Sequence, residues 1–220
     1  MSAPLYTEVP FNFLGSKLDN NFILLVTATQ TETFHLHSNL KPIDDGGLIY
    51  KIYKNNLTYF VGTIGIYNVV HVQCGMGSVS RDASLSTMKD AVVDLNPKVV
   101  IMIGIAFGIN KKKQSIGDVL ISESIIPYEF SKIGEINIQR SPSALASKLL
   151  VNRFKNNLDW IHILPDNKTA KIYVTDILSG EKLIDNIKFR NNLKLLIQQP
   201  MVERWKGQAY LWLVKRLIGY

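Results

Sequence analysis

The hydrophobic positions of the chain fall into short continuous runs separated by polar turns. Phe22–Ala28 (FILLVTA) and Lys98–Ile103 (KVVIMI) consist almost entirely of apolar residues. A strand covered on both faces has this pattern, whereas a half-exposed strand alternates apolar and polar residues. We therefore expect both runs to form central strands of a sheet.

Helical and extended patterns alternate along the rest of the chain. A helix is expected over Glu32–Leu40, and a second from Ser78 or Ser80, either of which suits an N-cap, to about Leu95. Asn96-Pro97 ends the second helix. The other expected elements are a meander of strands at 48–53, 59–64 and 68–73, strands at 117–122, 160–164 and 171–178, and helices at 143–156 and 181–197.

This order of elements predicts an α/β fold, a three-layer sandwich in which helices flank a mixed central β-sheet. Residues 21–202 make up the expected domain, and 220 residues suit one domain of medium size. Residues 1–20, interrupted by two prolines and one glycine, are expected to form an irregular lead-in. Residues 203–220 are expected to be an aberrant tail.

The composition restricts the class of protein. Hydrophobic residues make up 46% and charged residues 20% of the chain, which argues against disorder. The single cysteine, Cys74, excludes a disulfide scaffold and a cysteine-based zinc cluster. The sequence contains neither an apolar run of roughly 18 residues nor a signal-peptide pattern. We therefore expect a cytoplasmic protein with no membrane partner.

The net charge of +7 raises the question of nucleic-acid binding. The last 18 residues hold four basic side chains against one acidic side chain, so much of the excess lies in the tail. The densest basic run elsewhere, Lys111–Lys113, lies in a polar stretch typical of a solvated loop. We expect no nucleic-acid partner.

Five stretches of the chain combine strand ends with glycine-rich turns: VTATQTE (26–32), CGMG (74–77), VVIMIGIAFGIN (99–110), IGDVLIS (116–122) and ILSGEKLIDN (177–186). In this order and spacing they resemble the nucleoside phosphorylase and nucleosidase superfamily, especially 5′-methylthioadenosine/S-adenosylhomocysteine nucleosidases. The resemblance extends from about residue 22 to residue 198. It implies a nucleoside phosphorylase-like fold and hydrolysis of the N-glycosidic bond of a purine nucleoside, a small-molecule partner. Relatives commonly dimerise, so it also implies a homodimer.

The chemistry of glycosidic cleavage directs attention to Glu32. The reaction needs a carboxylate that activates water and an acid that protonates the leaving base. The family places its water-activating glutamate shortly after the first buried strand, so the resemblance implies that Glu32 is the general base. The alternative is a solvated glutamate in the first turn of a helix, where the helix dipole favours it.

The resemblance also implies a set of substrate-binding residues. Gly75, Met76 and Gly77 match a loop at the floor of the ribose pocket, with Met76 as an apolar wall; alternatively, Met76 belongs to the core at a glycine-rich helix start. The second segment consists of Ile105, Ala106 and Phe107, and its backbone would lie against the nucleoside. The third consists of Leu183 and Ile184, which would hold the purine.

Three of the matched positions depart from the usual family pattern. Ile105 stands where a serine is common, Phe107 where glycine is common, and Leu183 where an aromatic residue is common. The first change would remove a ribose contact, and the other two would alter the base pocket. We therefore expect altered selectivity for the base.

The four histidines do not have the spacing of metal ligands. His35 and His37 are two residues apart, so they do not share a helix face. His71 and His162 lie in strand-like segments, where a structural role is expected. We expect neither a metal ion nor a cofactor.

Two other functions stay open from the sequence. Phosphorylases of this superfamily carry a phosphate site with glycine and arginine near the first strand end, and Thr27–Glu32 contains neither residue. Arg81 could reach a phosphate, but it reads more simply as a surface charge on a helix. Water is thus the expected nucleophile, with phosphorolysis as the alternative. A nucleotide-binding regulatory or effector module without turnover is the second alternative, and Ile105 and Phe107 favour it.

The tail departs from the family. Relatives continue with a Glu-Met-Glu-Gly segment, a strand bearing a catalytic Asp and a closing helix, whereas this chain reads VERWKGQAY from Val202 and stops at Tyr220. We therefore expect a truncated fold without its last strand and helix, and weak or no turnover.

A shifted reading frame would account for this tail. Back-translation of Glu203–Tyr220 allows another frame that reads Glu-Met-Glu-Gly, and Trp205-Lys206 forces the second Glu of that motif. The alternatives are a gene remnant and a natural tail in which Leu211–Leu217 docks as an apolar helix.

Overall fold

The structure is a computed structural model that describes residues 5–18, 21–45, 47–77, 83–108, 114–127, 131–132, 138–139, 143–180, 202–203 and 210–214. These residues fall into two compact units, one up to Ile103 and one from Gly104 onward. Each unit is described by itself below.

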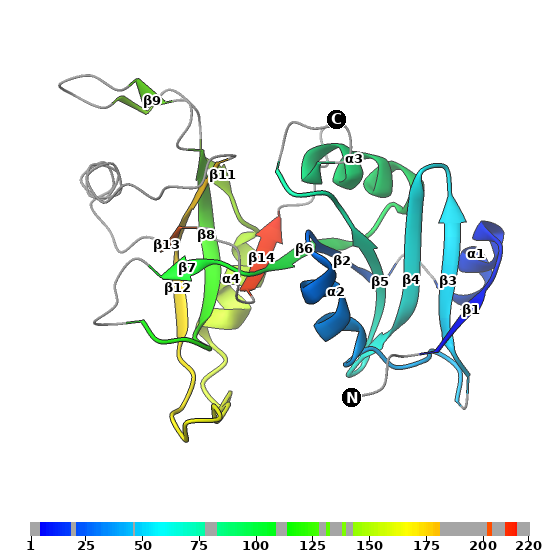
Figure 1. The fold of residues 1–220 in the computed structure, drawn as a ribbon, viewed down its shortest axis with the longest axis horizontal. Helices are drawn as coiled ribbons and strands as arrows, with labels where there is room; N and C mark the ends of the chain where they lie inside the picture. The colour runs from blue at the N-terminus through cyan, green and yellow to red at the C-terminus, as the bar shows by residue number, and fades with distance from the viewer. Residues whose placement is uncertain are drawn as a thin grey trace. The chain divides into compact units, whose positions relative to one another are not determined.

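The first unit is built around a mixed β-sheet (Figure 1). Its strands are Tyr6–Glu8 (β1), Ile23–Thr27 (β2), Ile49–Lys54 (β3), Leu57–Ile64 (β4), Tyr67–Gln73 (β5) and Val99–Gly104 (β6). The strands lie in the order β1-β3-β4-β5-β2-β6. Strands β5, β2 and β6 are parallel, β3, β4 and β5 form antiparallel hairpins, and β1 joins β3 in parallel. The expected meander and both apolar central strands are therefore confirmed.

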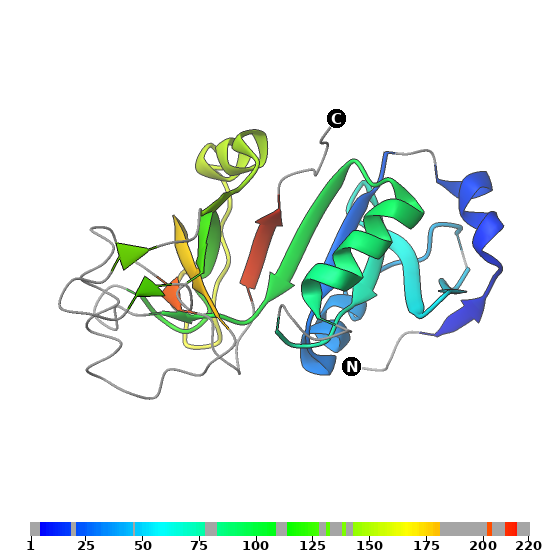
Figure 2. The ribbon, with the colours of Figure 1, turned by 90° about the horizontal axis from the view of Figure 1, so that it is seen from above.

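Two helices cover opposite faces of this sheet, and two neighbouring residues of β4 show it. The ring of Phe60 packs 4.5 Å from that of His37 in helix α2 (Gln30–His37). The hydroxyl of the adjacent Tyr59 donates to Asp94 of helix α3 (Ser84–Leu95) over 3.0 Å. Because successive side chains of a strand point to opposite faces, α2 and α3 lie on different sides of the sheet. Figure 2 shows α3 running along the strands. The unit thus has the expected three layers.

The ends of both helices follow from their sequences. Helix α2 begins at Gln30, two residues before the expected start, because Thr29 caps it. Helix α3 has Ala83 as its N-cap, so the expected N-cap at Ser78 or Ser80 is wrong. It ends at Leu95, because Asn96 adopts a left-handed conformation with φ of 44°, as residues after helix ends often do.

Residues 5–18 of the lead-in are not irregular, contrary to expectation. It contains β1, a 3₁₀ turn at Phe11–Phe13 (η1) and a short helix, Leu14–Lys17 (α1). Tyr6 pairs with Ile49 of β3, and its ring packs 5.1 Å from that of Phe60. Pairing with the edge of β3 and burial of aromatic surface order this segment, and neither can be read from local composition.

The second unit contains a sheet in the order β14-β8-β12-β13-β7, with β11 paired to β8. The strands are Phe107–Gly108 (β7), Val119–Pro127 (β8), Ala144–Leu145 (β11), Ile172–Ser179 (β12), Val202–Glu203 (β13) and Tyr210–Val214 (β14), with a separate hairpin of Ser131–Lys132 (β9) and Ile138–Gln139 (β10). Strands β8, β12 and β14 are parallel neighbours, and β8 and β12 confirm the strands expected at 117–122 and 171–178.

Three expectations for this unit need correction. Residues 160–164 form no strand, and Ile163 makes only an isolated bridge to Thr169. The helix expected over 143–156 begins at Lys148 (α4, Lys148–Lys155), because Ala144 and Leu145 pair with β8 instead. Residues 210–214 of the tail form β14, so a strand stands beside β8 where the sequence led us to expect none. The helix expected over 181–197 lies outside the described residues.

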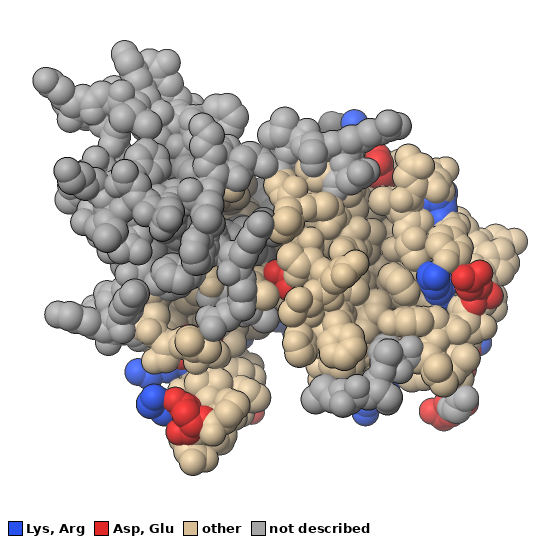
Figure 3. Space-filling model, viewed as in Figure 1, with Lys and Arg blue, Asp and Glu red and all other residues tan. Residues whose placement is uncertain are grey.

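The described charges do not gather into a basic surface on the face drawn in Figure 3, where lysines and arginines lie singly or beside acidic side chains. The ion pairs agree, for example Lys17 with Asp44 at 2.8 Å and Lys168 with Asp166 at 2.7 Å. Among the helices of the described ranges, none is both long and apolar enough to cross a membrane.

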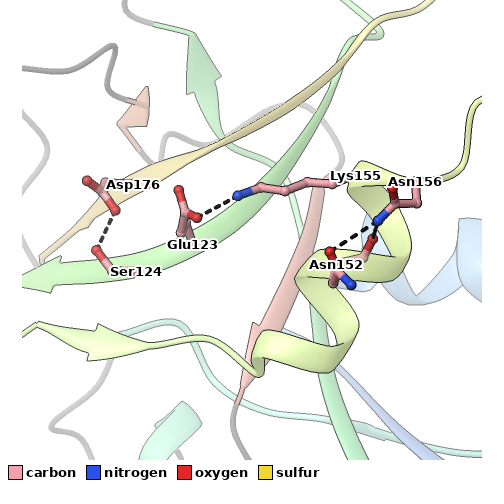
Figure 4. Close-up of polar contacts among 6 residues, drawn as sticks. All are labelled: Glu123, Ser124, Asn152, Lys155, Asn156 and Asp176. Carbon is pink, nitrogen blue, oxygen red and sulfur yellow. Dashed lines mark hydrogen bonds and ion pairs between the residues drawn. The ribbon is translucent and has the colours of Figure 1, made fainter.

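Polar side chains connect the elements of the second unit (Figure 4). Ser124 of β8 donates to Asp176 of β12 over 2.6 Å, next to a shift in the strand register after Thr175. Lys155 of α4 pairs with Glu123 of β8 at 2.7 Å. The first bond joins β8 to β12 beside the register shift, and the second joins α4 to β8.

Candidate functional site

The carboxyl ends of β2 and β5 lie side by side. Thr27, the last residue of β2, is paired with Gln73, the last residue of β5. The backbone N–H of Cys74 donates to the carbonyl of Thr27 over 2.8 Å. Ligands of open α/β sheets bind at this edge of parallel strands. The turn into α2 and the loop that begins at Gly75 therefore start from one edge of the sheet.

Glu32 is held at the first of these turns. The residue is only 6% exposed. The backbone N–H groups of Ala28 and Thr29 donate to its Oε2, each over 2.9 Å. In return, the Thr29 hydroxyl accepts from the N–H of Glu32 over 3.2 Å, which completes a capping box. The carboxylate is thus buried and oriented, so the alternative of a solvated glutamate is wrong.

The position of this carboxylate also bears on its chemistry. The two amide bonds fix the plane and direction of the group through one oxygen. A carboxylate at a strand end, fixed in this way, can accept a proton from a water molecule in a defined position.

The loop after β5 leaves the sheet at Gly75. This residue bridges Ala83 in parallel, and the carbonyl of Gly77 accepts from both the N–H and the hydroxyl of Ser84, at 3.1 and 3.0 Å. Gly77 has φ of 94°, which favours glycine. The Met76 side chain is 55% exposed, so the alternative that places it in the core is wrong.

The other expected site residues belong to the second unit. Ala106 is buried, Ile105 is partly buried and Phe107 begins β7. Leu183 and Ile184 lie outside the described residues. Their roles stay predictions.

Sequence reasoning missed a chain of polar side chains behind this edge. His37 of α2 and His71 of β5 are hydrogen-bonded over 2.8 Å, and His71 continues to Thr27 over 2.9 Å. Burial lowers the pKa of His37 to about 4 and lowers that of His71 well below its usual value, so both rings are neutral at pH 7. A histidine inside the otherwise apolar strand VVHV was the signal that could have revealed it. As expected, His35 does not share this face and is exposed.

Within the described ranges, His, Cys, Asp and Glu side chains form no group of three or more that could hold a metal ion. The Asp118 carboxylate instead accepts from the backbone N–H groups of Ser115 and Lys171, at 2.7 and 2.9 Å. These two hydrogen bonds give Asp118 a structural role.

The fold and this strand edge define an α/β protein of the open-sheet class, with its candidate site at the ends of parallel strands. Residues 23–174 match the sequence profile of the Phosphorylase superfamily. The chain belongs to the Phosphorylase superfamily, and the resemblance found in the sequence is confirmed.

Solved structures agree on the fold. The chain is 19% identical to a protein from Borrelia burgdorferi provisionally assigned as a 5′-methylthioadenosine/S-adenosylhomocysteine nucleosidase and bound to adenine, with a TM-score of 0.66 over 87% of this chain and 84% of that one. It is 18% identical to an S-adenosylhomocysteine nucleosidase from Streptococcus pyogenes in complex with 5-methylthiotubericidin, with a TM-score of 0.65 over 89% and 82%. The expected nucleoside phosphorylase-like fold is confirmed.

A curated relative is a death domain-containing ATP nucleosidase from Amphimedon queenslandica. It is 24% identical over 193 residues, which cover 77% of this chain and 36% of the relative. The chain thus spans little more than a third of that protein's length.

Proposed function

We propose that this chain hydrolyses the N-glycosidic bond of a purine nucleoside, with Glu32 as the general base that activates water. Membership of the superfamily and the nucleosidase names of its relatives support the reaction class. The observation that carries the proposal is the Glu32 carboxylate, which is buried at the carboxyl edge of β2 and oriented by two backbone amides.

The reaction sets the task of each proposed residue. As the bond to the base breaks, the sugar becomes an oxocarbenium-like cation that water attacks. Glu32 orients that water and takes its proton. Gly75 and Gly77 let the backbone approach the sugar, because neither residue has a side chain to obstruct it. Met76 offers an exposed apolar side chain to the substituent at the 5′ position.

The substrate's base is proposed to lie against residues of two further segments. The backbone of Ile105, Ala106 and Phe107 would face the nucleoside, and Leu183 and Ile184 would hold the purine. Aliphatic residues provide a broad apolar surface without the ring stacking that an aromatic residue supplies. We therefore propose a purine-directed site of relaxed selectivity.

Water is the proposed nucleophile, because Thr27–Glu32 contains neither an arginine nor a glycine to bind phosphate. Product analysis decides the question, because hydrolysis gives the free sugar whereas phosphorolysis gives a sugar 1-phosphate and depends on added phosphate.

The substitution Glu32→Gln tests the proposal. Glutamine keeps the size of the side chain and its acceptor oxygen for the capping box, but it is not a base. We expect release of adenine from 5′-methylthioadenosine, S-adenosylhomocysteine or ATP to fall by roughly 10²–10⁴-fold, with nucleoside binding retained. Chromatography of the products measures the rate.

The matched control is Glu123→Gln, which changes an exposed carboxylate of the second unit that pairs with Lys155. We expect wild-type rates from it. If Glu32→Gln cleaves as fast as wild type, or if the folded chain neither binds nor cleaves any nucleoside of the panel, the proposed function is wrong.

The frame-shift hypothesis for residues 203–220 stays a prediction with its own test. Resequencing the gene from codon 198 onward should reveal a downstream second frame that encodes an Asp-bearing strand and a final helix, and the absence of such a frame would exclude the idea. The same test bears on the weak or absent turnover expected for the 220-residue chain, since a restored frame would supply an acid for the leaving base. The cytoplasmic location and the homodimer also stay predictions; analytical ultracentrifugation tests the latter.

A further inference from the structure

A continuous series of side-chain hydrogen bonds crosses the first unit. It begins at β1, passes through the two buried histidines and ends where β2 and β5 finish. We call this series the relay. Its links are Tyr6–His37 (2.7 Å), His37–His71 (2.8 Å), His71–Thr27 (2.9 Å), Thr27–Thr33 (2.6 Å) and Thr33–Gln73 (2.9 Å).

The direction of the relay near the site follows from counting protons. Thr33 donates its hydroxyl proton to Oε1 of Gln73. Its oxygen must therefore accept from the hydroxyl of Thr27. The proton of Thr27 is then used, so its oxygen can only accept from Nε2–H of His71. His71 must carry its proton on Nε2.

The same count continues to the other end. A neutral His71 with its proton on Nε2 accepts at Nδ1, so the Nε2–H of His37 donates to it. His37 then accepts at Nδ1 from the hydroxyl of Tyr6. Every link has one donor and one acceptor when both rings are neutral, in agreement with the lowered pKa values that burial gives them.

The last links of the relay join two elements that carry the candidate site. Thr33 directly follows Glu32 on α2, and Gln73 is the last residue of β5, just before Cys74 and the Gly75 loop. We propose that the relay positions Glu32 by fixing the first turn of α2 against the end of β5. This inference rests on the proposed function of Glu32 as the base.

The physical reason for such a device is the precision that catalysis needs. A base displaced by about 1 Å can lose on the order of 10²-fold in rate. The capping box fixes Glu32 only within its own turn, through Ala28 and Thr29. The relay adds fixed points on β2 and β5. Thr27 and His71 are buried and hold its inner end, whereas the last bond, Thr33–Gln73, is exposed.

Thr33 offers the sharpest test, because it is only partly buried and valine has its shape. Thr33→Val removes both of its hydrogen bonds, whereas Thr33→Ser keeps them. We expect Thr33→Val to lower kcat by roughly 10–100-fold with KM within about threefold of wild type, and Thr33→Ser to restore kcat. The matched control, Thr31→Val, alters an exposed residue of the same helix outside the relay and should keep wild-type rates.

Two measurements do not depend on turnover. Hydrogen exchange of the Ala28 and Thr29 amides, which donate to Glu32, should be roughly tenfold faster in Thr33→Val than in Thr31→Val. Nitrogen-15 NMR of the imidazole rings in the wild-type chain should show His37 and His71 neutral and protonated on Nε2.

The outcomes separate this inference from the proposed function. If Glu32→Gln is inactive but Thr33→Val matches Thr31→Val in kcat, the relay does not position the base. If the chain neither binds nor cleaves any nucleoside of the panel, the proposed function fails. Unchanged exchange in Thr33→Val overturns the positioning role whether or not the chain shows turnover. A proton on Nδ1 of either histidine overturns the direction derived above.

Discussion

At the scale of single residues, Gly62 in β4 shows how closely the first unit is packed. A Cβ atom at this position would lie 2.5 Å from the carbonyl oxygen of Lys41 and 2.8 Å from Cγ of Leu40. The backbone oxygen cannot move freely, because Lys41 and Thr63 exchange two backbone hydrogen bonds, at 2.9 and 2.7 Å. The absence of a side chain is therefore required here.

We predict that Gly62→Ala lowers the free energy of unfolding by about 1–3 kcal/mol or more, as overpacking does. Gly15→Ala is the control, since a Cβ there meets no atom within 4 Å. Chemical denaturation monitored by circular dichroism measures both variants. Equal stabilities of the two would show that the loop of Leu40 and Lys41 can move away from β4.

At the scale of elements, the start of α2 depends on one hydroxyl group. The eight-residue helix buries only Glu32, Leu36 and His37 and has no strong apolar stripe, and the burial of Leu36 and His37 holds its far end. Its first turn is held by the reciprocal bonds of Thr29 and Glu32. A short helix gains little from its own hydrogen bonds in water, so its cap matters.

Thr29→Ala should therefore cost about 1 kcal/mol of stability, the usual cost of losing such a cap. Thr29→Ser keeps the hydroxyl and should cost much less. Denaturation reports the global effect, and hydrogen exchange of the Thr33 amide, which donates to the carbonyl of Thr29 over 3.0 Å, reports the local one. Identical behaviour of the two variants would mean that the Glu32 bonds alone hold the turn.

At the scale of the whole molecule, the buried histidines link stability to pH. Folding lowers the pKa of His37 to about 4, from 6.5 in the unfolded chain. Between these values the unfolded chain binds more protons, so stability falls as pH falls through this window. His71, whose pKa is also lowered, acts in the same direction.

We predict a loss of about 3 kcal/mol between pH 7 and pH 4 from His37, whose pKa is about 4 in the fold. Urea denaturation at a series of pH values measures it. His37→Gln cannot be protonated, so its stability should depend less on pH over this range. If the variant and the wild type show the same slope, His37 does not titrate as its burial requires.

Much of the fold could be predicted from the sequence. The apolar runs FILLVTA and KVVIMI correctly indicated strands buried on both faces, because a strand without alternation has no face left for water. Asn96-Pro97 correctly ended a helix. Trp160–Leu164 was a wrong prediction, since its composition suits a strand but it makes only one bridge, at Ile163.

The candidate site was less predictable. Glu32 could be singled out from its place after an apolar strand, together with the family resemblance. Its burial and its bonds to Ala28 and Thr29 required the turn geometry. The relay joins residues up to 44 positions apart, as between Thr27 and His71, and no local pattern predicts such a contact.

By itself, the sequence determined the class of fold, the central strands and the end of α3 at Asn96-Pro97, because these depend on the order of apolar residues and on neighbours a few positions away. The tertiary structure alone decided the pairing of the lead-in with β3, the exposure of Met76 and the neutral state of His37 and His71. These features depend on side chains distant in sequence that meet in space, and on the loss of water around them.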